Sequence, residues 1–190
     1  MKKIPSLFKR DHEGTRLVYD VVVEGCEWVQ DGKGVPTEKI DGTCCLIEGG
    51  KLFKRYDAKN GRTPPAGFIP TGDADPVTGH HTGWLPVGEG PEDQWHREAF
   101  ATIPDRESGT YELIGPKVQG NPYIQVQHSL IRHGSVLLGL DVPTDFHGVR
   151  DWLEEQPGIE GVVWHHPDGE RSCKVKRRDW GLPWPPKVTP

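Results

Sequence analysis

The sequence predicts an α+β fold in which mainly antiparallel sheets are flanked by a small number of helices. Two features of the composition favour this fold over a helical bundle: the 190 residues include 24 glycines and 18 prolines, and only 34% of them are hydrophobic. Such a composition is typical of a compact core that carries long ordered loops. The third observation is a series of short apolar or β-branched runs separated by turn residues, which is the pattern of strands.

The first half of the chain contains most of the predicted strands. Residues 16–23 are largely apolar and β-branched, which predicts a buried strand. Residues 35–48 predict two strands with a break at Asp41-Gly42, and the pair Gly49-Gly50 predicts a hairpin turn into a partner strand over 52–56.

The second half mixes helices and strands. A short helix is predicted over 92–101, and strands over 110–114 and 135–142. Thr144 is the predicted N-cap of a helix over 145–155.

The last two predicted strands, over 159–164 and 172–177, are joined by a turn that contains Pro167-Asp168-Gly169. Since 190 residues suit a single domain, we expect one domain over residues 1–190. We expect an irregular loop around residues 60–91, where Gly and Pro are frequent, and an extended Pro-rich tail over 183–190.

The charge and the cysteine content exclude some kinds of binding surface and metal site. The net charge of −5 and the pI near 6.0 argue against a uniformly basic surface for nucleic acid, although a local patch is possible at 174–178. The four cysteines form no CxxC pair, and the adjacent Cys44 and Cys45 point to opposite faces of a strand. We therefore expect reduced thiols and no metal site at the four positions, which are Cys26, Cys44, Cys45 and Cys173.

Membrane and export signals are not found in the sequence. No apolar run reaches the roughly 20 residues that span a bilayer, and the first residues lack the apolar stretch of a signal peptide. We expect a cytoplasmic protein with no membrane partner.

Four short segments carry charged side chains on or beside predicted strands. They are Glu38-Lys39-Ile40-Asp41-Gly42, Tyr111-Glu112-Leu113-Ile114-Gly115, Glu160-Gly161-Val162-Val163-Trp164 and Lys174-Val175-Lys176. The two lysines of the last segment share one face because strand side chains alternate, and that face suits a phosphate. Glu112 and Glu160 lie on otherwise apolar strands, where a carboxylate is costly unless it is paired or bound to a ligand.

Each segment also has a structural interpretation. Lys39 on its own would be a solvated strand lysine, the two glutamates could be structural ion pairs, and the two lysines could protect a sheet edge. All four segments in this order resemble the motifs of the covalent nucleotidyltransferase superfamily, which includes ATP-dependent ligases and mRNA capping enzymes. The KxDG pattern alone is weak, whereas the ordered set is specific.

The runs 111–122 and 78–84 are similar to small stand-alone ATP-dependent 5′-to-3′ RNA ligases. This resemblance covers about residues 35–180. It implies a nucleotidyltransferase (ATP-grasp-like) domain of two mainly antiparallel sheets flanked by helices, without an OB domain. It also implies an AMP-forming RNA ligase that joins RNA 3′-hydroxyl and 5′-phosphate ends in RNA repair, with no obligate protein partner.

The resemblance implies roles for individual residues. Lys39 would attack the α-phosphate of ATP and carry AMP, so its amine must lose a proton, which nearby cations favour. Lys174 and Lys176 would contact the phosphates, and Glu160 would hold Mg²⁺ or Mn²⁺ with help from Asp41. Four further groups would bind the nucleotide: the Glu38 carbonyl and the Ile40 amide at the adenine edge, and Glu112 with Arg55 at the ribose. Lys54 is the weaker alternative to Arg55, because only one of two strand neighbours faces a pocket.

The sequence departs from the family pattern at Cys44, where many members have Arg or Asn. The aromatic residue that stacks on adenine is also not evident, and Phe146 is a possible substitute. Arg177 and Arg178 could contact RNA phosphates or face water. The pairs His80-His81 and His165-His166 lack zinc-ligand spacing, so we expect loop histidines.

Two other functions are compatible with these residues. A DNA ligase or a capping-type guanylyltransferase would use the same fold and nucleophile. A degenerate nucleotide-binding or RNA-binding module would have no need for the nucleophile, and the intact motifs argue against it.

Overall fold

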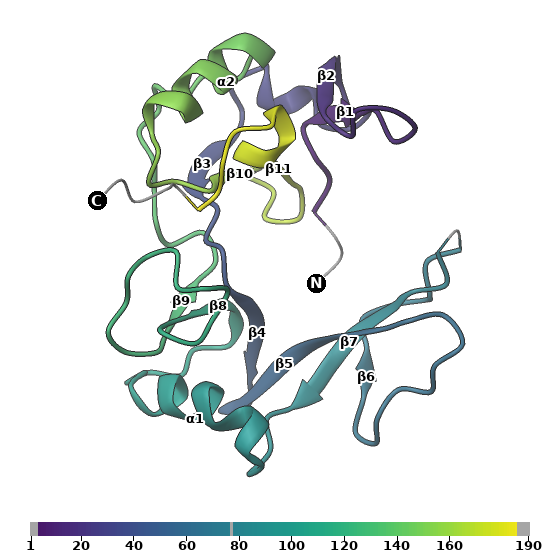
Figure 1. Cartoon of the computed structure of the whole chain (residues 1–190), viewed down its shortest axis with the longest axis vertical. Helices are drawn as coiled ribbons and strands as arrows, with labels where there is room; N and C mark the ends of the chain where they lie inside the picture. The colour runs from purple at the N-terminus through teal and green to yellow at the C-terminus, as the bar shows by residue number, and fades with distance from the viewer. Residues whose placement is uncertain (1–3, 77, 186–190) are drawn as a thin grey trace. The chain divides into compact units, whose positions relative to one another are not determined.

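A computed structural model describes residues 4–76 and 78–185 of the chain. These residues form two compact units, of which unit 1 comprises residues 41–133 and unit 2 comprises residues 4–40 and 134–185. In Figure 1, unit 1 has the blue to teal colours of the middle of the chain, and unit 2 combines the purple N-terminal and the green to yellow C-terminal segments. The predicted single domain over 1–190 stays a prediction.

Unit 1 contains a six-stranded antiparallel sheet in the order β6-β7-β5-β4-β8-β9. The strands are β4 (Thr43–Glu48), β5 (Lys51–Ala58), β6 (Ile69–Pro70), β7 (His81–Pro86), β8 (Gly109–Ile114) and β9 (Ser129–Arg132). A 3₁₀ turn η2 (Pro91–Asp93) leads into helix α1 (Gln94–Ala101), which packs on this unit. Gly49 and Gly50 both have positive φ, as the predicted hairpin between β4 and β5 requires.

The core of unit 1 lies on one face of this sheet. Its buried members are Cys45, Ile47, Leu52, Ala99, Tyr111, Leu113, Val118 and Leu130. Cys45 and Ile47 alternate with less buried neighbours along β4, so one face of that strand is apolar.

Two predictions for the middle of the chain were wrong. The segment 60–91 is not irregular throughout, because β7 pairs with β5 from Phe53↔Pro86 to Ala58↔His81. Residues 135–142 form no strand: Leu137 makes an isolated bridge to Thr37, and Leu140 is 90% exposed. The strand in that part of the sequence is β9, which precedes the apolar run.

Unit 2 contains a three-stranded antiparallel sheet, in the order β11-β10-β3, and a separate two-stranded pair, β1-β2. The elements are β1 (Phe8–Arg10), β2 (Val18–Val22), η1 (Glu27–Val29), β3 (Val35–Glu38), α2 (Phe146–Glu155), β10 (Gly161–His165), β11 (Ser172–Lys176) and η3 (Arg177–Trp180). The described residues thus form three sheets where the resemblance implied two. Several antiparallel sheets and few helices confirm the α+β class, whereas the nucleotidyltransferase fold stays a prediction.

Helix α2 begins at Phe146, one residue later than predicted, and its N-cap is shifted by the same one residue. Asp145, and not Thr144, is the N-cap, and its carboxylate accepts a hydrogen bond of 2.9 Å from the Gly148 amide. A carboxylate at this position also faces the positive end of the helix dipole.

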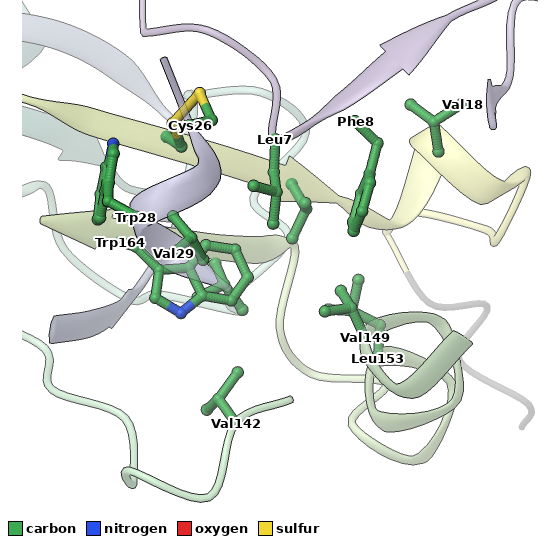
Figure 2. Packing of buried hydrophobic residues seen from close by; sticks show 13 residues of the cluster. Leu7, Phe8, Val18, Cys26, Trp28, Val29, Val142, Val149, Leu153 and Trp164 are labelled. Carbon is green, nitrogen blue, oxygen red and sulfur yellow. A yellow bond between two sulfur atoms is a disulfide. The ribbon is translucent and has the colours of Figure 1, made fainter. Parts of the chain in front are cut away.

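The core of unit 2 joins segments from both ends of the chain, as Figure 2 shows. Leu7 and Phe8 from the N-terminal segment pack with Val149 and Leu153 of α2 and with Trp164 of β10. The other buried members are Val18, Cys26, Trp28, Val29, Val142, Val162, Cys173 and Val175. The N-terminal segment is therefore an integral part of this unit.

A disulfide between Cys26 and Cys173 crosses this core, and it is the yellow bond in Figure 2. The prediction of four reduced thiols was wrong for these two residues. They are 147 positions apart, so only the tertiary structure brings them together. Cys44 and Cys45 are free thiols. No helix among the described residues is long and apolar enough to cross a bilayer.

Candidate active site

Lys39 and Glu160 form an ion pair at one end of the three-stranded sheet of unit 2. Lys39 directly follows β3, and Glu160 directly precedes β10. The Lys39 amide donates to the Gly161 carbonyl at 2.9 Å, and its Nζ lies 2.5 Å from Glu160 Oε2. The Glu160 side chain is only 8% exposed, so its carboxylate has a partner where it would otherwise be costly to bury.

Lys174 and Lys176 share one face of β11, as the alternation predicted. Cys173 and Val175 point into the core, whereas the two lysines between and beside them are half-buried. Lys176 pairs with Gly161 in the register of β10 and β11, and Gly161 also accepts the hydrogen bond from the Lys39 amide. The backbone thus aligns the lysine of KxDG with the second lysine of KxK.

The electrostatics confirm that these lysines are close to one another. Burial, and then the positive charges of Lys39 and Lys176, lower the pKa of Lys174 from its ordinary value. Glu160 and Asp179 act in the opposite direction. Unit 2 therefore contains a cluster of three ammonium groups and one buried carboxylate, formed by Lys39, Glu160, Lys174 and Lys176, which we call the lysine cluster.

A groove of about 700 Å³ opens beside the lysine cluster. Its lining includes Lys174 and Lys176 together with Lys9 and Arg10 of β1. Arg10 also pairs with the buried carboxylate of Asp179, which holds β1 close to the C-terminal end of β11. The N-terminal segment, outside the predicted motifs, thus adds two cations to the surface beside Lys174.

Glu38 and Ile40 flank Lys39 in unit 2 and were predicted to bind adenine through their backbone. The Glu38 amide already donates to the Val136 carbonyl at 2.9 Å. The Glu38 side chain lies opposite Val162, on the other face from Lys39, and burial raises its pKa. Only the Glu38 carbonyl and the Ile40 amide thus remain for the predicted adenine contacts, which stay predictions.

The remaining predicted residues belong to unit 1. Gly42 lies against β8: a Cβ atom there would be 2.2 Å from the Leu113 carbonyl oxygen. Its amide donates to Glu112 Oε1 at 3.1 Å, and the Asp41 amide donates to the Tyr123 hydroxyl at 2.7 Å. The Asp-Gly pair of the KxDG motif is therefore tied to unit 1, whereas its lysine is tied to unit 2.

The structure distinguishes Lys54 from Arg55. Lys54 pairs with Asp93, a buried carboxylate that also accepts a bond from the Gly88 amide, so it has a structural role. Arg55, on the other face of β5, lies with its Cζ 6.0 Å from the centre of the Trp84 ring. Arg55 as a ribose-binding residue stays a prediction.

Some residues predicted as possible ligand contacts are structural. Arg177 is buried, and its guanidinium donates to main-chain carbonyls of Leu153, Gln156 and Pro183. The Phe146 ring packs edge-on against Phe8, in the core, so it is occupied there.

The sequence did not point to His133, which follows β9. Its Nε2 lies 2.8 Å from Glu112 Oε2, so the carboxylate predicted to bind ribose has an imidazole partner. His133 belongs to no motif and is 21 positions from Glu112, so no local pattern could have identified it.

Comparisons with known proteins find similarity to RNA ligases. The family model described as RNA ligase 1 matches residues 99–189, which include Glu112, Glu160, Lys174 and Lys176. RNA ligase 1 of Pongo abelii is 26% identical over 259 aligned positions, covering 97% of this chain and 79% of that protein. The chain is a relative of the RNA ligase 1 proteins.

Other RNA ligase 1 proteins give the same result. The protein of Mus musculus is 27% identical over 93% of this chain and 76% of its own length, and that of Danio rerio is 26% identical over 78% and 68%. The mouse alignment has 251 positions although this chain has 190 residues, so the RNA ligase 1 relative contains additional segments. The predicted resemblance to RNA ligases is confirmed.

Proposed function

We propose that this protein is an ATP-dependent RNA ligase in which Lys39 is the nucleophile that carries AMP. The observation that supports it most is the lysine cluster, in which Lys39 pairs with a buried carboxylate and two further lysines lie on the strand paired with β10. The RNA ligase 1 relatives support RNA as the substrate. RNA with 5′-phosphate and 3′-hydroxyl ends, and a role in RNA repair, follow from the same resemblance.

The residues of the lysine cluster suit nucleotidyl transfer. Lys39 starts as an ammonium paired with Glu160, and it must leave this pair and lose its proton before it can attack. Lys174 and Lys176 place two further positive charges on the neighbouring strand β11. The same charges would stabilise the negative charge that develops on the phosphate oxygens.

Three displacements at phosphorus complete the reaction. Lys39 Nζ forms a bond to the α-phosphorus of ATP, and the bond to pyrophosphate breaks. The 5′-phosphate of RNA then attacks the same phosphorus, which frees Lys39 and gives an RNA 5′-adenylate. Finally a 3′-hydroxyl attacks the RNA phosphate, so a phosphodiester forms, AMP leaves and the hydroxyl proton is released.

Glu160 is the residue best suited to hold a divalent metal. Its carboxylate is buried, negatively charged and already turned toward a cation, the Lys39 ammonium. Mg²⁺ or Mn²⁺ prefers such oxygen ligands together with water, and when bound it would neutralise charge on the phosphates. Asp41, as a second metal ligand, and Glu112 and Arg55, as ribose ligands, belong to unit 1 and remain part of the proposal.

Sequence and structure give different indications of where the protein is located. A cytoplasmic location was inferred from sequence signals, whereas the disulfide Cys26–Cys173 is of a kind that is rare in reducing compartments. The ligase proposal does not depend on where the protein acts.

The first experiment tests covalent nucleotidylation. The protein is stripped of bound AMP with pyrophosphate, incubated with α-labelled ATP or GTP and Mg²⁺ or Mn²⁺, and separated on a denaturing gel. We expect label from ATP that Lys39→Ala abolishes. The matched control is Lys33→Ala, which removes an exposed lysine of the same unit and should keep the label. Absence of label in the wild type would refute the enzyme, and label from GTP alone would favour a capping-type activity.

The second experiment tests the strand that is joined. Nicked duplexes and single strands of 5′-phosphorylated RNA and DNA are offered to the labelled protein, and ligated products are measured. We expect joining of RNA ends. Joining of nicked DNA but not of RNA would keep Lys39 as the nucleophile and overturn the choice of substrate.

A further inference from the structure

Three side chains on one face of the unit 1 sheet form a cluster that the ligase proposal does not use as a unit. They are Cys44 of β4, Glu112 of β8 and His133, which follows β9. One ligand atom of each, the sulfur, a carboxylate oxygen and a ring nitrogen, lies within 4.8 Å of the other two. Each residue is half-buried, so this is not a chance group of exposed charges.

The strand register builds this cluster. Cys44 is directly opposite Glu112 in the β4–β8 pair, so the two side chains leave the same face. The His133 amide donates to the Thr110 carbonyl at 3.0 Å, which places His133 beside Thr110, two residues before Glu112 on β8. Side chains two apart on a strand share a face, so His133 and Glu112 meet.

Neighbouring groups orient two of the three side chains. The Thr110 hydroxyl lies 2.9 Å from His133 Nδ1, which leaves Nε2 directed at Glu112. Glu112 Oε1 accepts the Gly42 amide at 3.1 Å, which leaves Oε2 for His133. Such outer hydrogen bonds fix the ring and the carboxylate of metal-binding residues in proteins.

The contact between His133 and Glu112 requires a positive charge or a proton. Nε2 and Oε2 are 2.8 Å apart, and two lone pairs at that distance would repel. A proton shared in a hydrogen bond satisfies this contact. A zinc ion bound to both atoms, at about 2.0–2.2 Å from each, would replace this proton and move the two atoms farther apart. The threonine hydroxyl can donate or accept, so it suits both forms of the ring.

The chemistry of the three ligands selects the class of metal. A thiolate and an imidazole are the preferred ligands of zinc, and a carboxylate oxygen is a common third ligand. Mg²⁺ and Mn²⁺ prefer oxygen, so they would bind this set poorly. Cys45, the neighbouring thiol, points into the core of unit 1 and is not available.

We propose that Cys44, Glu112 and His133 bind one Zn²⁺ ion in unit 1, with a fourth coordination position open to water or to a substrate oxygen. On binding, the Cys44 thiol releases its proton to solvent. The proton between His133 Nε2 and Glu112 is exchanged for one on Nδ1, which then donates to the Thr110 hydroxyl. Zinc bonds form to the sulfur, to Nε2 and to the carboxylate oxygen in place of the hydrogen bond between His133 and Glu112. The site does not include Lys39, which belongs to unit 2, but it uses Glu112, so zinc bound here would displace the ribose contact proposed for this carboxylate.

The experiment measures metal binding directly. The full-length protein is freed of metal by a chelator and titrated with Zn²⁺ against a chromophoric chelator, and in parallel with Co²⁺. We expect one zinc ion per chain and, with Co²⁺, the charge-transfer absorption of a cobalt–thiolate bond. Cys44→Ser should abolish this absorption, and His133→Gln should abolish tight zinc binding. Thr110→Val, which removes the partner of Nδ1, should weaken zinc binding by about 10–100-fold.

The matched control is Cys45→Ala, which removes the adjacent free thiol and should leave the cobalt–thiolate absorption in place. Circular dichroism of each variant shows whether it is folded. No thiolate absorption in the wild type, its persistence in Cys44→Ser, or binding of Mg²⁺ as tight as that of Zn²⁺ would each overturn the proposal. Since the assay contains no ATP, and Lys39→Ala should bind zinc normally, failure here is distinguishable from failure of the ligase proposal.

Discussion

Arg177 allows the sharpest test of the fold, because sequence and structure assign it different roles. It directly follows the KxK segment, and its sequence context suggested RNA phosphates or water as its partners. In the structure only 4% of the residue is exposed. Its guanidinium donates to the Leu153 carbonyl, to the Gln156 carbonyl at 3.2 Å and to the Pro183 carbonyl at 2.9 Å. Arg177 thus ties the end of α2 to the segment after η3.

These hydrogen bonds give the size of the stability loss expected for Arg177→Ala. Truncation in Arg177→Ala leaves three carbonyls without their charged donor, and a hydrogen bond to a charged group contributes about 1.5–3 kcal/mol. The low end of that range sums to about 4.5 kcal/mol. Burying the guanidinium charge costs solvation free energy, which is also why burial lowers the pKa of Arg177. Removing that cost offsets part of the loss, so we expect a net loss of roughly 3 kcal/mol in the free energy of unfolding.

Urea unfolding followed by tryptophan fluorescence measures this loss in the relevant unit. Five of the seven tryptophans belong to unit 2, so they dominate the signal. With a slope of about 1–3 kcal/mol per molar urea, the midpoint should fall by about 1–3 M. The control is Arg178→Ala. That residue is exposed and, within residues 4–76 and 78–185, its side chain donates to one carbonyl, that of Trp184, so we expect a loss below about 1 kcal/mol. Equal midpoints for the two variants, or weakened RNA binding by Arg177→Ala at unchanged stability, would refute the structural role.

Three further predictions concern stability. Gly161→Ala should lower the free energy of unfolding in urea by about 1–3 kcal/mol, because the new Cβ would lie 2.1 Å from a carbonyl oxygen of β11. Gly158→Ala, whose Cβ would have no atom within 4 Å, should not lower it, and equal effects of the two variants would contradict this reasoning. Burial lowers the pKa of His96 below its ordinary value of 6.5. The folded protein therefore holds this ring in its neutral form, and His96 lowers the free energy of unfolding as the pH falls below about 6.5. Thermal unfolding of His96→Phe should therefore depend less on pH between about 7 and about 5 than that of the wild type, and parallel profiles would exclude the effect. Reduction of Cys26–Cys173, or Cys26→Ser, should lower the free energy of unfolding by about 2–5 kcal/mol, and an unchanged urea midpoint would contradict this.

Local patterns in the sequence predicted the elements that carry the lysine cluster. Alternating burial along β11 was evident from Lys174-Val175-Lys176, because side chains of a strand alternate whatever the strand pairs with. The Gly49-Gly50 turn was predicted for the same kind of reason, since positive φ is a property of the residues themselves. The strand predicted over residues 135–142 was wrong because these residues are apolar but lie largely outside the core, and the sequence does not show which apolar runs become buried.

The sequence by itself determined the four motifs, the resemblance to RNA ligases and the residue types of the lysine cluster. The tertiary structure decided which of these groups meet. It paired Lys39 with Glu160 and joined His133 to Glu112 and Cys44. Arg177 and Arg178 show the reason most clearly. The same side chain stands at both positions, yet one is buried under α2 and the other is exposed, because burial depends on what distant segments pack against each residue.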